Sequence, residues 1–457
     1  MLSYLLDNEK FSELFSLWQS TPFIYFGLNS EKPSLTRWEI FQVAEQLSHQ
    51  LPKNDFSVIL LFQQRHHFLI GLLATALKNG RCILPPNLAD ITLNNLAKQH
   101  PNAYVMAEHC PQRLKKQMFI TDKAITQLIH KVQAKPTPFS KKALTAYLNT
   151  IQNAEIWLFT SGTTATPKQV IKTWKNMMLS AEIAIKRFQL MQSHYIVATV
   201  PSQHMFGLET TIFWPLFSAS CQWFDRPIFP EDILEALNAN TQHPTYLIST
   251  PLHLQKILEF KLYWPYHLSY VLSATAPLSL KYAQKIEASF NVNVFEIYGS
   301  TETASIASRQ TTQSKYWQAY EEVVFQTHQN QILVKTPGLV SFQHLNDQIE
   351  QIDCSHFILG QRDADLIKVS GKRASLTELN QCLQNIPNVS EGIFLPSKNS
   401  ERLMAFVVSS LPAVEILAAL RESIDPVFLP RPLHFIEVLP RNDIGKIMYN
   451  QLLSKIK

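Results

Sequence analysis

The stretch Glu155-Ile-Trp-Leu-Phe-Thr-Ser-Gly-Thr-Thr-Ala-Thr-Pro-Lys168 decides how the rest of this 457-residue sequence is interpreted. A short apolar strand runs into a turn of hydroxyl-bearing residues that closes on a lysine, and a helix is predicted from Lys175 to Phe188. Hydroxyls and free backbone N–H groups can surround phosphate oxygens, and the lysine adds a mobile positive charge. The order of strand, polar turn, lysine and helix therefore predicts a phosphate-binding loop. The spacing of a Walker loop is absent, and an ordinary hydroxyl-rich surface turn remains the alternative.

The surrounding sequence repeats short apolar strands between helices. Strands alternating with helices indicate a parallel sheet that is covered by helices. Residues 134–145 carry few large apolar groups and are predicted to be a connection. After Gly338 the pattern changes to short hairpin-like strands, and from Ile367 it indicates a compact α+β unit. The predicted strands are 57–62, 155–160, 195–200, 245–249, 268–273 and 292–297, and the other predicted helices are 38–50 and 68–78.

The composition is that of a globular protein. Hydrophobic residues make up 46% and charged residues 17% of the sequence, which suits a sizeable core divided into two or three domains. The net charge of +5 is small and dispersed, so no nucleic-acid surface is predicted. The five cysteines form no close pair, and no segment has the length or the leader pattern of a membrane anchor. A soluble cytoplasmic protein without stable membrane insertion follows as the expectation.

A second polar turn follows the apolar strand that ends at Ile297. The sequence there is Tyr298-Gly299-Ser300-Thr301-Glu302. It offers an aromatic face for adenine, a hydroxyl for a phosphate and a carboxylate for Mg²⁺, which together suit an ATP site. A strand-end turn with an exposed glutamate is the alternative interpretation.

These two turns resemble the adenylate-forming superfamily of acyl-CoA synthetases, peptide-synthetase adenylation domains and luciferases. The family motifs are Thr-Ser-Gly-Thr-Thr-Gly-x-Pro-Lys-Gly and Tyr-Gly-x-Thr-Glu, from which this chain departs at Ala165 and Gln169. The resemblance implies ATP and Mg²⁺ as cofactors, with Tyr298 on adenine, Thr301 on phosphate and Glu302 on the metal as catalytic groups. It also implies a phosphate loop that binds the nucleotide through Thr160, Ser161, Gly162, Thr163, Thr164 and Lys168.

Two later segments extend the resemblance. Asp347 and Arg362 match the residues that bind the ribose in this family, and Asp365 matches its hinge residue. Leu439-Pro-Arg-Asn-Asp-Ile-Gly-Lys446-Ile resembles the family's C-terminal motif, so Lys446 is the implied catalytic lysine that stabilises charge as the adenylate forms. The resemblance implies an α/β fold with an N-terminal domain at 1–363 and a small mobile C-terminal α+β domain at 364–457.

The acid pocket is assigned from a third segment. His204 and Phe206 match the histidine and aromatic residue that acyl- and aryl-activating members present to the acid, and Thr275 lies in a turn that resembles the family's Gly-Gly-Ala-Pro-Leu. Gly207 stands where amino-acid-activating members place an aspartate, which disfavours an amino-acid substrate. Glu209, two positions on, keeps that possibility open. A core histidine and a core aromatic residue remain the alternative.

The resemblance implies that a carboxylic acid, fatty or aryl, becomes an acyl-adenylate and passes to a thiol. The acceptor is CoA or the phosphopantetheine of a separate acyl carrier protein, since the sequence ends soon after Lys446. A weaker likeness points to the stand-alone ligases of aryl-polyene and fatty-acid-like clusters. A non-catalytic nucleotide- or acyl-binding protein is the main alternative, because the family has glycine at four positions where this chain has Ala165, Gln169, Ala274 and Asn346. A luciferase-like oxygenase that skips the thiol step is another.

Overall fold

The chain forms two compact units. Unit 1 comprises Met1–Val324 and Val334–Gln343, and unit 2 comprises Phe325–Leu333 and His344–Lys457. The units divide earlier in the chain than residue 363, and the predicted domains at 1–363 and 364–457 stay a prediction. This computed structural model describes residues 18, 21–26, 34–115, 118–159, 168–260, 264–328, 331–362, 366–369, 372–397, 402–442, 445 and 447–454.

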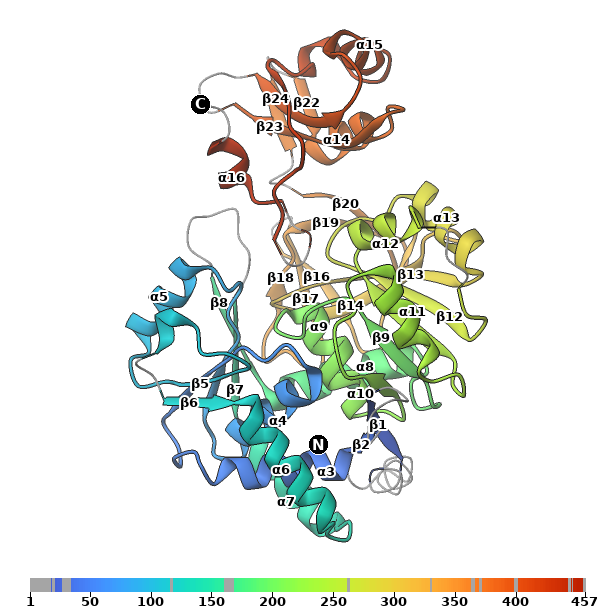
Figure 1. Ribbon diagram of the computed structural model, residues 1–457. Helices are drawn as coiled ribbons and strands as arrows, with labels where there is room; N and C mark the ends of the chain where they lie inside the picture. The colour runs from blue at the N-terminus through green and yellow to red at the C-terminus, as the bar shows by residue number, and fades with distance from the viewer. Residues whose placement is uncertain are drawn as a thin grey trace. The chain divides into compact units, whose positions relative to one another are not determined.

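The first sheet of unit 1 has the strand order β6-β5-β3-β4-β7-β8 (Figure 1). Its strands pair in parallel except β8, which runs antiparallel to β7. The predicted order of strand, turn, lysine and helix is wrong at one point, because strand β8 lies between Lys168 and the helix. The strands are β3 (Ser57–Leu60), β4 (Arg81–Ile83), β5 (Tyr104–Ala107), β6 (Met118–Thr121), β7 (Glu155–Phe159) and β8 (Gln169–Thr173).

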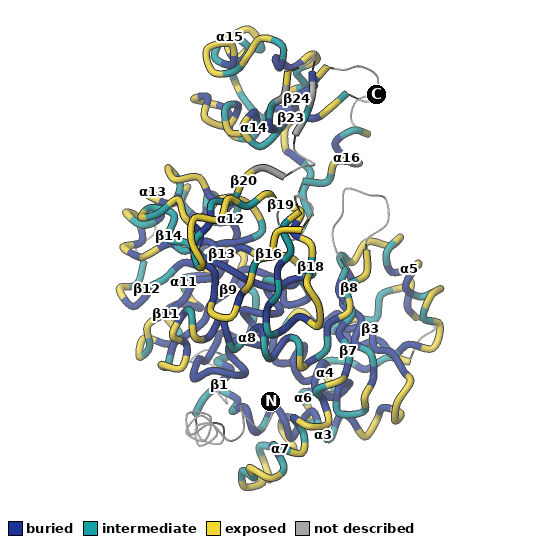
Figure 2. The backbone as a smooth tube through the Cα atoms, turned by 180° about the vertical axis from the view of Figure 1, so that it is seen from behind, coloured by how far each residue is buried: buried dark blue, intermediate teal, exposed yellow. Residues whose placement is uncertain are grey.

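Helices cover this sheet. Helix α4 packs on β3 and β4 and is buried along almost its whole length, whereas α5 and α7 are largely exposed (Figure 2). Residues 141–145, predicted to be part of a connection, instead begin α7 after the side chain of Ser140 caps its first turn. The helices are α3 (Arg37–Ser48), α4 (Arg65–Leu77), α5 (Asp90–Gln99), η1 (Gln112–Leu114), α6 (Asp122–Ala134) and α7 (Lys141–Ile151).

The second sheet of unit 1 runs in the order β15-β14-β13-β12-β11-β9-β10-β1-β2. Its central strands β13, β12, β11, β9 and β10 are parallel, as the alternating pattern predicts, and β14 turns back against β13. The strands are β1 (Pro22–Tyr25), β2 (Ser34–Thr36), β9 (Tyr195–Ala198), β10 (Cys221–Trp223), β11 (Thr245–Ser249), β12 (Leu268–Ser273), β13 (Asn293–Ser300), β14 (Ala304–Gln310) and β15 (Trp317–Ala319).

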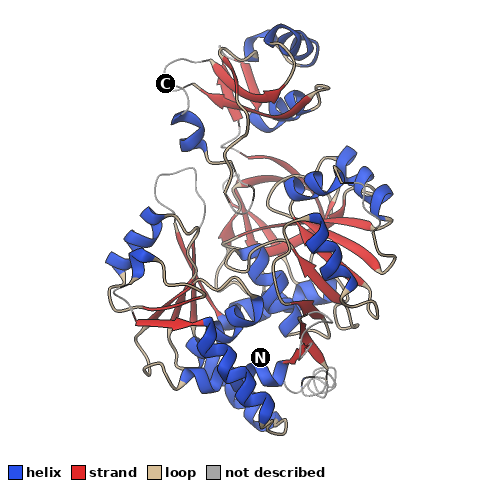
Figure 3. Cartoon of the chain, viewed as in Figure 1, coloured by secondary structure: helices blue, strands red, loops and turns tan. Residues whose placement is uncertain are grey.

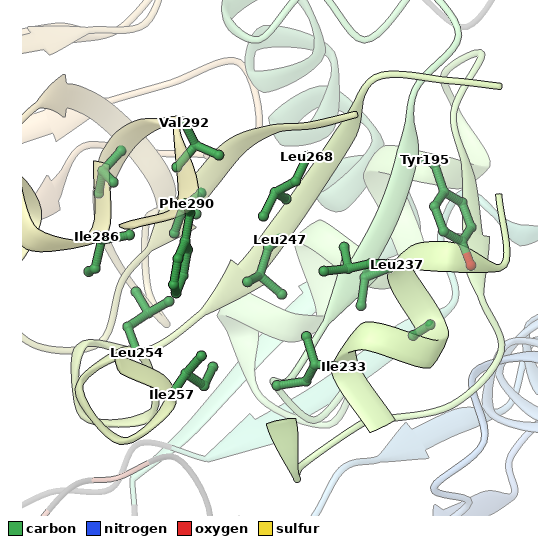
Figure 4. Packing of buried hydrophobic residues seen from close by; sticks show 14 of the residues in the cluster. Tyr195, Ile233, Leu237, Leu247, Leu254, Ile257, Leu268, Ile286, Phe290 and Val292 are labelled. Atoms are coloured by element: carbon green, nitrogen blue, oxygen red, sulfur yellow. The ribbon is translucent and has the colours of Figure 1, made fainter. Parts of the chain in front are cut away.

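One face of the second sheet is covered by α11 (Pro230–Asn238), α12 (Pro251–Leu258) and α13 (Leu280–Phe290). Apolar side chains from these helices, such as Ile233 and Phe290, meet Leu247 of β11 in one buried cluster (Figure 4). Burying side chains of this size contributes about 1.5–3 kcal/mol each, so the cluster stabilises the packing of these helices on the sheet.

Helix α8 (Trp174–Arg187) lies between the two sheets of unit 1, since it contacts both β8 and β14. Beside it runs a continuous helical stretch made of α9 (Met205–Leu208), the π-helical segment η2 (Glu209–Phe213) and α10 (Trp214–Leu216). A π-helical turn inside an α-helix is uncommon and is often found at functional sites. This stretch directly follows His204.

Unit 2 contains small sheets and helices of the α+β kind (Figure 3). Leu383, Val407 and Leu420 belong to a separate apolar core of this unit. Within the described ranges of the whole chain, no helix is long and apolar enough to cross a membrane. The elements from the division onward are β16 (Val324–His328), β17 (Gln331–Lys335), β18 (Gln343–His344), β19 (Asp347–Gln351), β20 (His356–Arg362), β21 (Leu366–Val369), β22 (Lys372–Ser375), α14 (Leu376–Gln384), β23 (Val389–Pro396), β24 (Leu403–Ser409), α15 (Ala413–Ser423), η4 (Pro426–Phe428), β25 (Leu433–Phe435) and α16 (Tyr449–Ser454).

Candidate active site

The predicted phosphate loop connects β7 to β8. Phe159 and Gln169 are opposite each other in the antiparallel pair of β7 and β8, so the loop joins the two strands of a hairpin. Lys168 is exposed just before β8 begins. The loop residues Thr160, Ser161, Gly162, Thr163 and Thr164 lie outside the described residues, and their role stays a prediction.

The turn between β13 and β14 carries Thr301 and Glu302. Ser300 and Thr303 hold it closed: the amide of Ser300 donates to the Thr303 hydroxyl at 3.0 Å, and the amide of Thr303 donates to the Ser300 hydroxyl at 3.2 Å. A Cβ on Gly299 would lie 2.2 Å from the carbonyl oxygen of Ala304, so only glycine fits this close approach. Thr301 and Glu302 are half-buried at the tip, where a ligand can reach them.

Tyr298, the predicted adenine-stacking residue, packs on an aromatic and charged support. Its ring centroid lies 5.7 Å from that of Trp317, and the guanidinium of Arg309 lies 4.6 Å from the Trp317 ring centroid. Arg309 in turn donates two hydrogen bonds to Glu296, at 2.8 and 2.6 Å. The residue predicted to stack on adenine therefore contacts groups that the sequence did not indicate.

Two buried charged side chains meet the same turn. Lys172 of β8 donates from Nζ to the backbone carbonyl of Glu302. Glu209, at the start of η2, accepts from the backbone amide of Ser305 at 3.0 and 3.1 Å and from its hydroxyl at 2.8 Å. The strand after the phosphate loop, the turn with Glu302 and the helix after His204 are thereby brought together within unit 1.

The surroundings shift the pKa values of both charged groups. Burial raises the pKa of Glu209 to about 7, against the opposing effects of the Ser305 hydrogen bonds and of the charge on Lys172. Burial lowers the pKa of Lys172 to about 8, against the opposing charges of Glu209 and Glu302. Each charge thus offsets part of the desolvation cost of the other.

The residues predicted for the acid pocket lie in two separate segments. His204 and Phe206 are half-buried at the start of the helical stretch. A Cβ on Gly207 would lie 2.0 Å from the carbonyl oxygen of Pro201, so the aspartate of amino-acid-activating enzymes could not be placed there without a backbone shift. Glu209 is committed to Ser305 inside the unit, which removes the alternative that it faces a substrate ammonium.

Thr275 adopts a backbone conformation that side chains rarely take. Its φ of 80° is in the left-handed region, which is strained for a β-branched residue. The turn that contains it is anchored where the amide of Leu278 donates to Glu296 at 2.7 Å. Strained backbone of this kind is often found at binding sites, so Thr275 remains a candidate for the acid pocket.

Unit 2 carries the other predicted site residues. Asp347 and Arg362 are opposite each other in the backbone register of the β19–β20 hairpin, and their role in binding the ribose stays a prediction. Arg441 donates to Glu391 at 2.6 and 3.1 Å and to the carbonyl of Gly445 at 2.8 Å. Lys446 and the hinge residue Asp365 lie outside the described residues.

The donors at the β13–β14 turn fit a magnesium ion that arrives with ATP. Across the part of the chain that the structure describes, His, Cys, Asp and Glu side chains do not gather in threes that could hold a metal by themselves. Mg²⁺ usually takes one or two carboxylates together with substrate phosphates. Glu302 is the carboxylate predicted for this role, and it is half-buried next to Thr301 in the turn.

Residues 36–337 match the protein family described as AMP-binding enzyme. Sulfoacetate–CoA ligase of Cupriavidus necator is 26% identical over 349 residues, covering 65% of this chain and 66% of that protein. Anthranilate–CoA ligase of Pseudomonas aeruginosa is 24% identical over 340 residues, covering 64% of this chain and 65% of that protein. The chain thus spans slightly less than two thirds of the length of these relatives.

Solved structures share the fold over nearly the whole chain. O-succinylbenzoate CoA synthetase of Bacillus subtilis in complex with AMP superimposes with a TM-score of 0.77 at 17% identity, covering 96% of this chain and 97% of that one. ATP-bound MatB of Rhodopseudomonas palustris gives a TM-score of 0.73 at 18% identity, with 98% of each chain covered. The predicted α/β fold with a smaller C-terminal α+β part is confirmed.

Proposed function

Because the chain belongs to the AMP-binding enzyme family, we propose that it uses ATP to activate a carboxylic acid and then transfers the acyl group to a thiol. The observation that carries the proposal is the hydrogen bond from Lys172 to the Glu302 carbonyl. This hydrogen bond joins the strand that follows the hydroxyl-rich loop to the turn whose Glu302 carboxylate is proposed to bind the metal. Two segments suited to phosphates and to Mg²⁺, about 130 positions apart in the sequence, therefore lie side by side.

The chemistry divides into two steps. A carboxylate oxygen of the acid attacks the α-phosphorus of ATP, the bond to the bridging oxygen breaks, and pyrophosphate leaves. A thiolate then attacks the acyl carbon, and AMP leaves with the former carboxylate oxygen. When bound, Mg²⁺ neutralises phosphate charge. Glu302 would hold it, and Thr301 and Lys446 would stabilise charge that develops on the phosphate and the acid.

CoA is the proposed thiol, since the similar proteins named above are CoA ligases. The phosphopantetheine of an acyl carrier protein is the narrower proposal and is tested beside it. A fatty or aryl acid is proposed rather than an amino acid, because Gly207 leaves no room for an aspartate and Glu209 is engaged with Ser305. Free cysteines are typical of a reducing compartment, which supports a cytoplasmic site of action.

The small C-terminal domain is proposed to change its pose between the two steps. In the first step Lys446 faces the reaction, and in the second a rotation about Asp365 replaces it and admits the thiol. Asp347 and Arg362 would bind the ribose in both steps.

The test is pyrophosphate release with ATP and Mg²⁺ across a panel of fatty, hydroxy-fatty, benzoic and cinnamic acids. CoA and a phosphopantetheinylated carrier protein are added in parallel reactions. Release with one class of acid, increased by one acceptor, would identify the ligase activity and both partners. ATP binding without release for any acid would favour the alternative of a nucleotide-binding protein that has lost catalysis.

The role of Lys446 has its own test in the two half-reactions. Lys446→Ala should slow pyrophosphate release by about 100-fold or more, because a group that stabilises developing charge is lost. Transfer of a preformed acyl-AMP to the thiol should change only a few-fold. Lys186→Met, which removes an exposed cation on α8, is the matched control and should leave both steps unchanged. An equal loss in both half-reactions would contradict this assignment.

A further inference from the structure

Lys172 is an unusual residue for its position. It is the second-last residue of β8 and lies opposite Ile156, and only 5% of its surface is exposed. A buried ammonium is costly unless hydrogen bonds and an opposite charge compensate it. Its Nζ donates to the carbonyl of Glu302, so this side chain joins the first sheet of unit 1 to a turn of the second.

Glu209 binds strand β14 directly after the same turn. Its carboxylate is 2% exposed and accepts from both the amide and the hydroxyl of Ser305. Ser305 lies opposite Gly299 across the hairpin, so the carboxylate fixes the strand just after the turn. Glu209 begins the π-helical segment, and the helical stretch containing it starts directly after His204.

We infer that Lys172 and Glu209 are positioning residues. Lys172 binds the turn at Glu302, and Glu209 binds the strand after it at Ser305. Together they fix the proposed nucleotide and metal site relative to both β8 and the helix of the proposed acid site. This inference rests on the proposed function. Neither side chain is assigned a contact with a substrate. Their effect passes through the backbone of the turn, which carries Thr301 and Glu302.

The opposite charges make a positioning role separable from a purely structural one. Lys172→Met removes the positive charge that partly compensates the buried Glu209 carboxylate, and Glu209→Gln removes one of the two negative charges, Glu209 and Glu302, that compensate the buried ammonium. In the double variant both charges are gone, so much of the lost thermal stability should return. The hydrogen bond to the Glu302 carbonyl stays absent, so the turn should remain poorly held.

The experiment measures turn protection, nucleotide binding and stability in the full-length chain. Hydrogen exchange of the unliganded protein should show the amides of Ser300 to Ser305 exchanging about tenfold faster in Lys172→Met and in the double variant, since a charged hydrogen bond is lost. The Kd for Mg²⁺ and α,β-methylene-ATP, which cannot release pyrophosphate, should rise about tenfold in both. The melting temperature should fall in each single variant and recover substantially in the double variant.

The control and the possible outcomes are distinct. Lys186→Met also removes a lysine charge from unit 1, at a site 43% exposed, and should leave exchange at the turn and nucleotide affinity within twofold of wild type. Recovery of turn protection and affinity together with stability in the double variant would overturn the inference. So would unchanged exchange in Lys172→Met. If the wild-type protein bound no nucleotide, the proposed function would fail. The exchange measurement would still show whether Lys172 restrains the backbone of the turn.

Discussion

Two arginine–glutamate pairs, one in each unit, have similar chemistry and different surroundings. In unit 1, Arg309 donates to one oxygen of Glu296 at 2.8 and 2.6 Å. In unit 2, Arg441 donates to one oxygen of Glu391 at 3.1 and 2.6 Å. The arginine side chains are 20% and 22% exposed, but the glutamates differ, at 4% and 16%.

The difference lies in what else each glutamate holds. Glu296 also accepts from the amide of Leu278 at 2.7 Å and from the hydroxyl of Thr311 at 2.7 Å, so it joins the Thr275 turn to β13 and the end of β14. Among the described residues, the Glu391 carboxylate accepts hydrogen bonds from Arg441 alone, and Arg441 also donates to the carbonyl of Gly445. A buried acid at a junction organises several segments, whereas a more exposed one mainly orients its arginine.

The largest effect is expected when the buried pair is broken. Glu296→Ala removes the acceptor for several donors and leaves Arg309 without its partner, which should cost about 4 kcal/mol of unfolding free energy. Denaturant unfolding of the full chain measures it. Arg309→Met with Glu296→Ala should cost less than the sum of the single changes, since the unpaired charge is gone. Additive costs would show that the pair is not coupled and would remove the contrast with unit 2.

Glycines extend the comparison from side chains to the backbone. Gly299→Ala places a Cβ 2.2 Å from the backbone oxygen of Ala304, which cannot move without opening the turn, so we expect a loss of about 3 kcal/mol. Gly392→Ala in unit 2 places a Cβ 2.6 Å from the end of the Leu383 side chain, which can change rotamer, so about 1 kcal/mol is expected. Thermal and denaturant unfolding of both variants test the order, and a larger loss in Gly392→Ala would reverse it.

The fold was largely predictable because its parallel strands are short and apolar. Strands such as Thr245–Ser249 and Leu268–Ser273 coincide with the predicted ranges, since burial on both faces leaves a continuous apolar run. Strand β8 was missed because Lys172 and Thr173 interrupt its apolar character and the strand is half-exposed. Helix α7 was missed in part because the proline-rich connection runs directly into its first turn.

The site was predictable where a motif is local. Tyr298, Gly299 and Glu302 follow one apolar strand, as the sequence indicated, and the structure adds the returning strand β14 that makes a hairpin. The supports Lys172, Glu209 and Arg309 could not be placed, because each acts on a partner brought near only by the packing of two sheets or two strands. The available sign was a charged residue within an apolar segment, as with Glu296 between Phe295 and Ile297. Such a residue requires a partner but does not name it.

Acid sensitivity gives a further contrast, because two adjacent buried histidines lie in unit 1. The rings of His66 and His67 are 4.0 Å apart. Burial lowers the pKa of His66 well below its ordinary value and lowers that of His67 to about 4. Both side chains are neutral in the folded protein and gain protons on unfolding below pH 6.5. Their contribution to the unfolding free energy is therefore present above that pH and is lost as the pH falls toward 4.

His66→Phe should therefore reduce the acid sensitivity of the chain. The loss of unfolding free energy between pH 7 and pH 5.5 should be smaller than in wild type by about 1 kcal/mol, because one proton is no longer taken up on unfolding. Phenylalanine suits the site, where the ring of His66 already contacts Phe26 and Phe224. Denaturant unfolding at the two pH values measures the difference, and an unchanged loss would show that His66 does not titrate on unfolding.

The smallest effect on stability is expected for Glu391, the more exposed glutamate of the two pairs. Glu391→Gln keeps an acceptor for Arg441 but removes the charge, which should cost about 1 kcal/mol because the pair is partly in water. Arg441 still reaches the carbonyl of Gly445, so pyrophosphate release should fall only about threefold if Lys446 acts as proposed. Arg441→Met removes both contacts and should slow that step further than it slows thioester formation from acyl-AMP. If Glu391→Gln proved as destabilising as Glu296→Ala, exposure of the glutamate would not explain the difference between the two units.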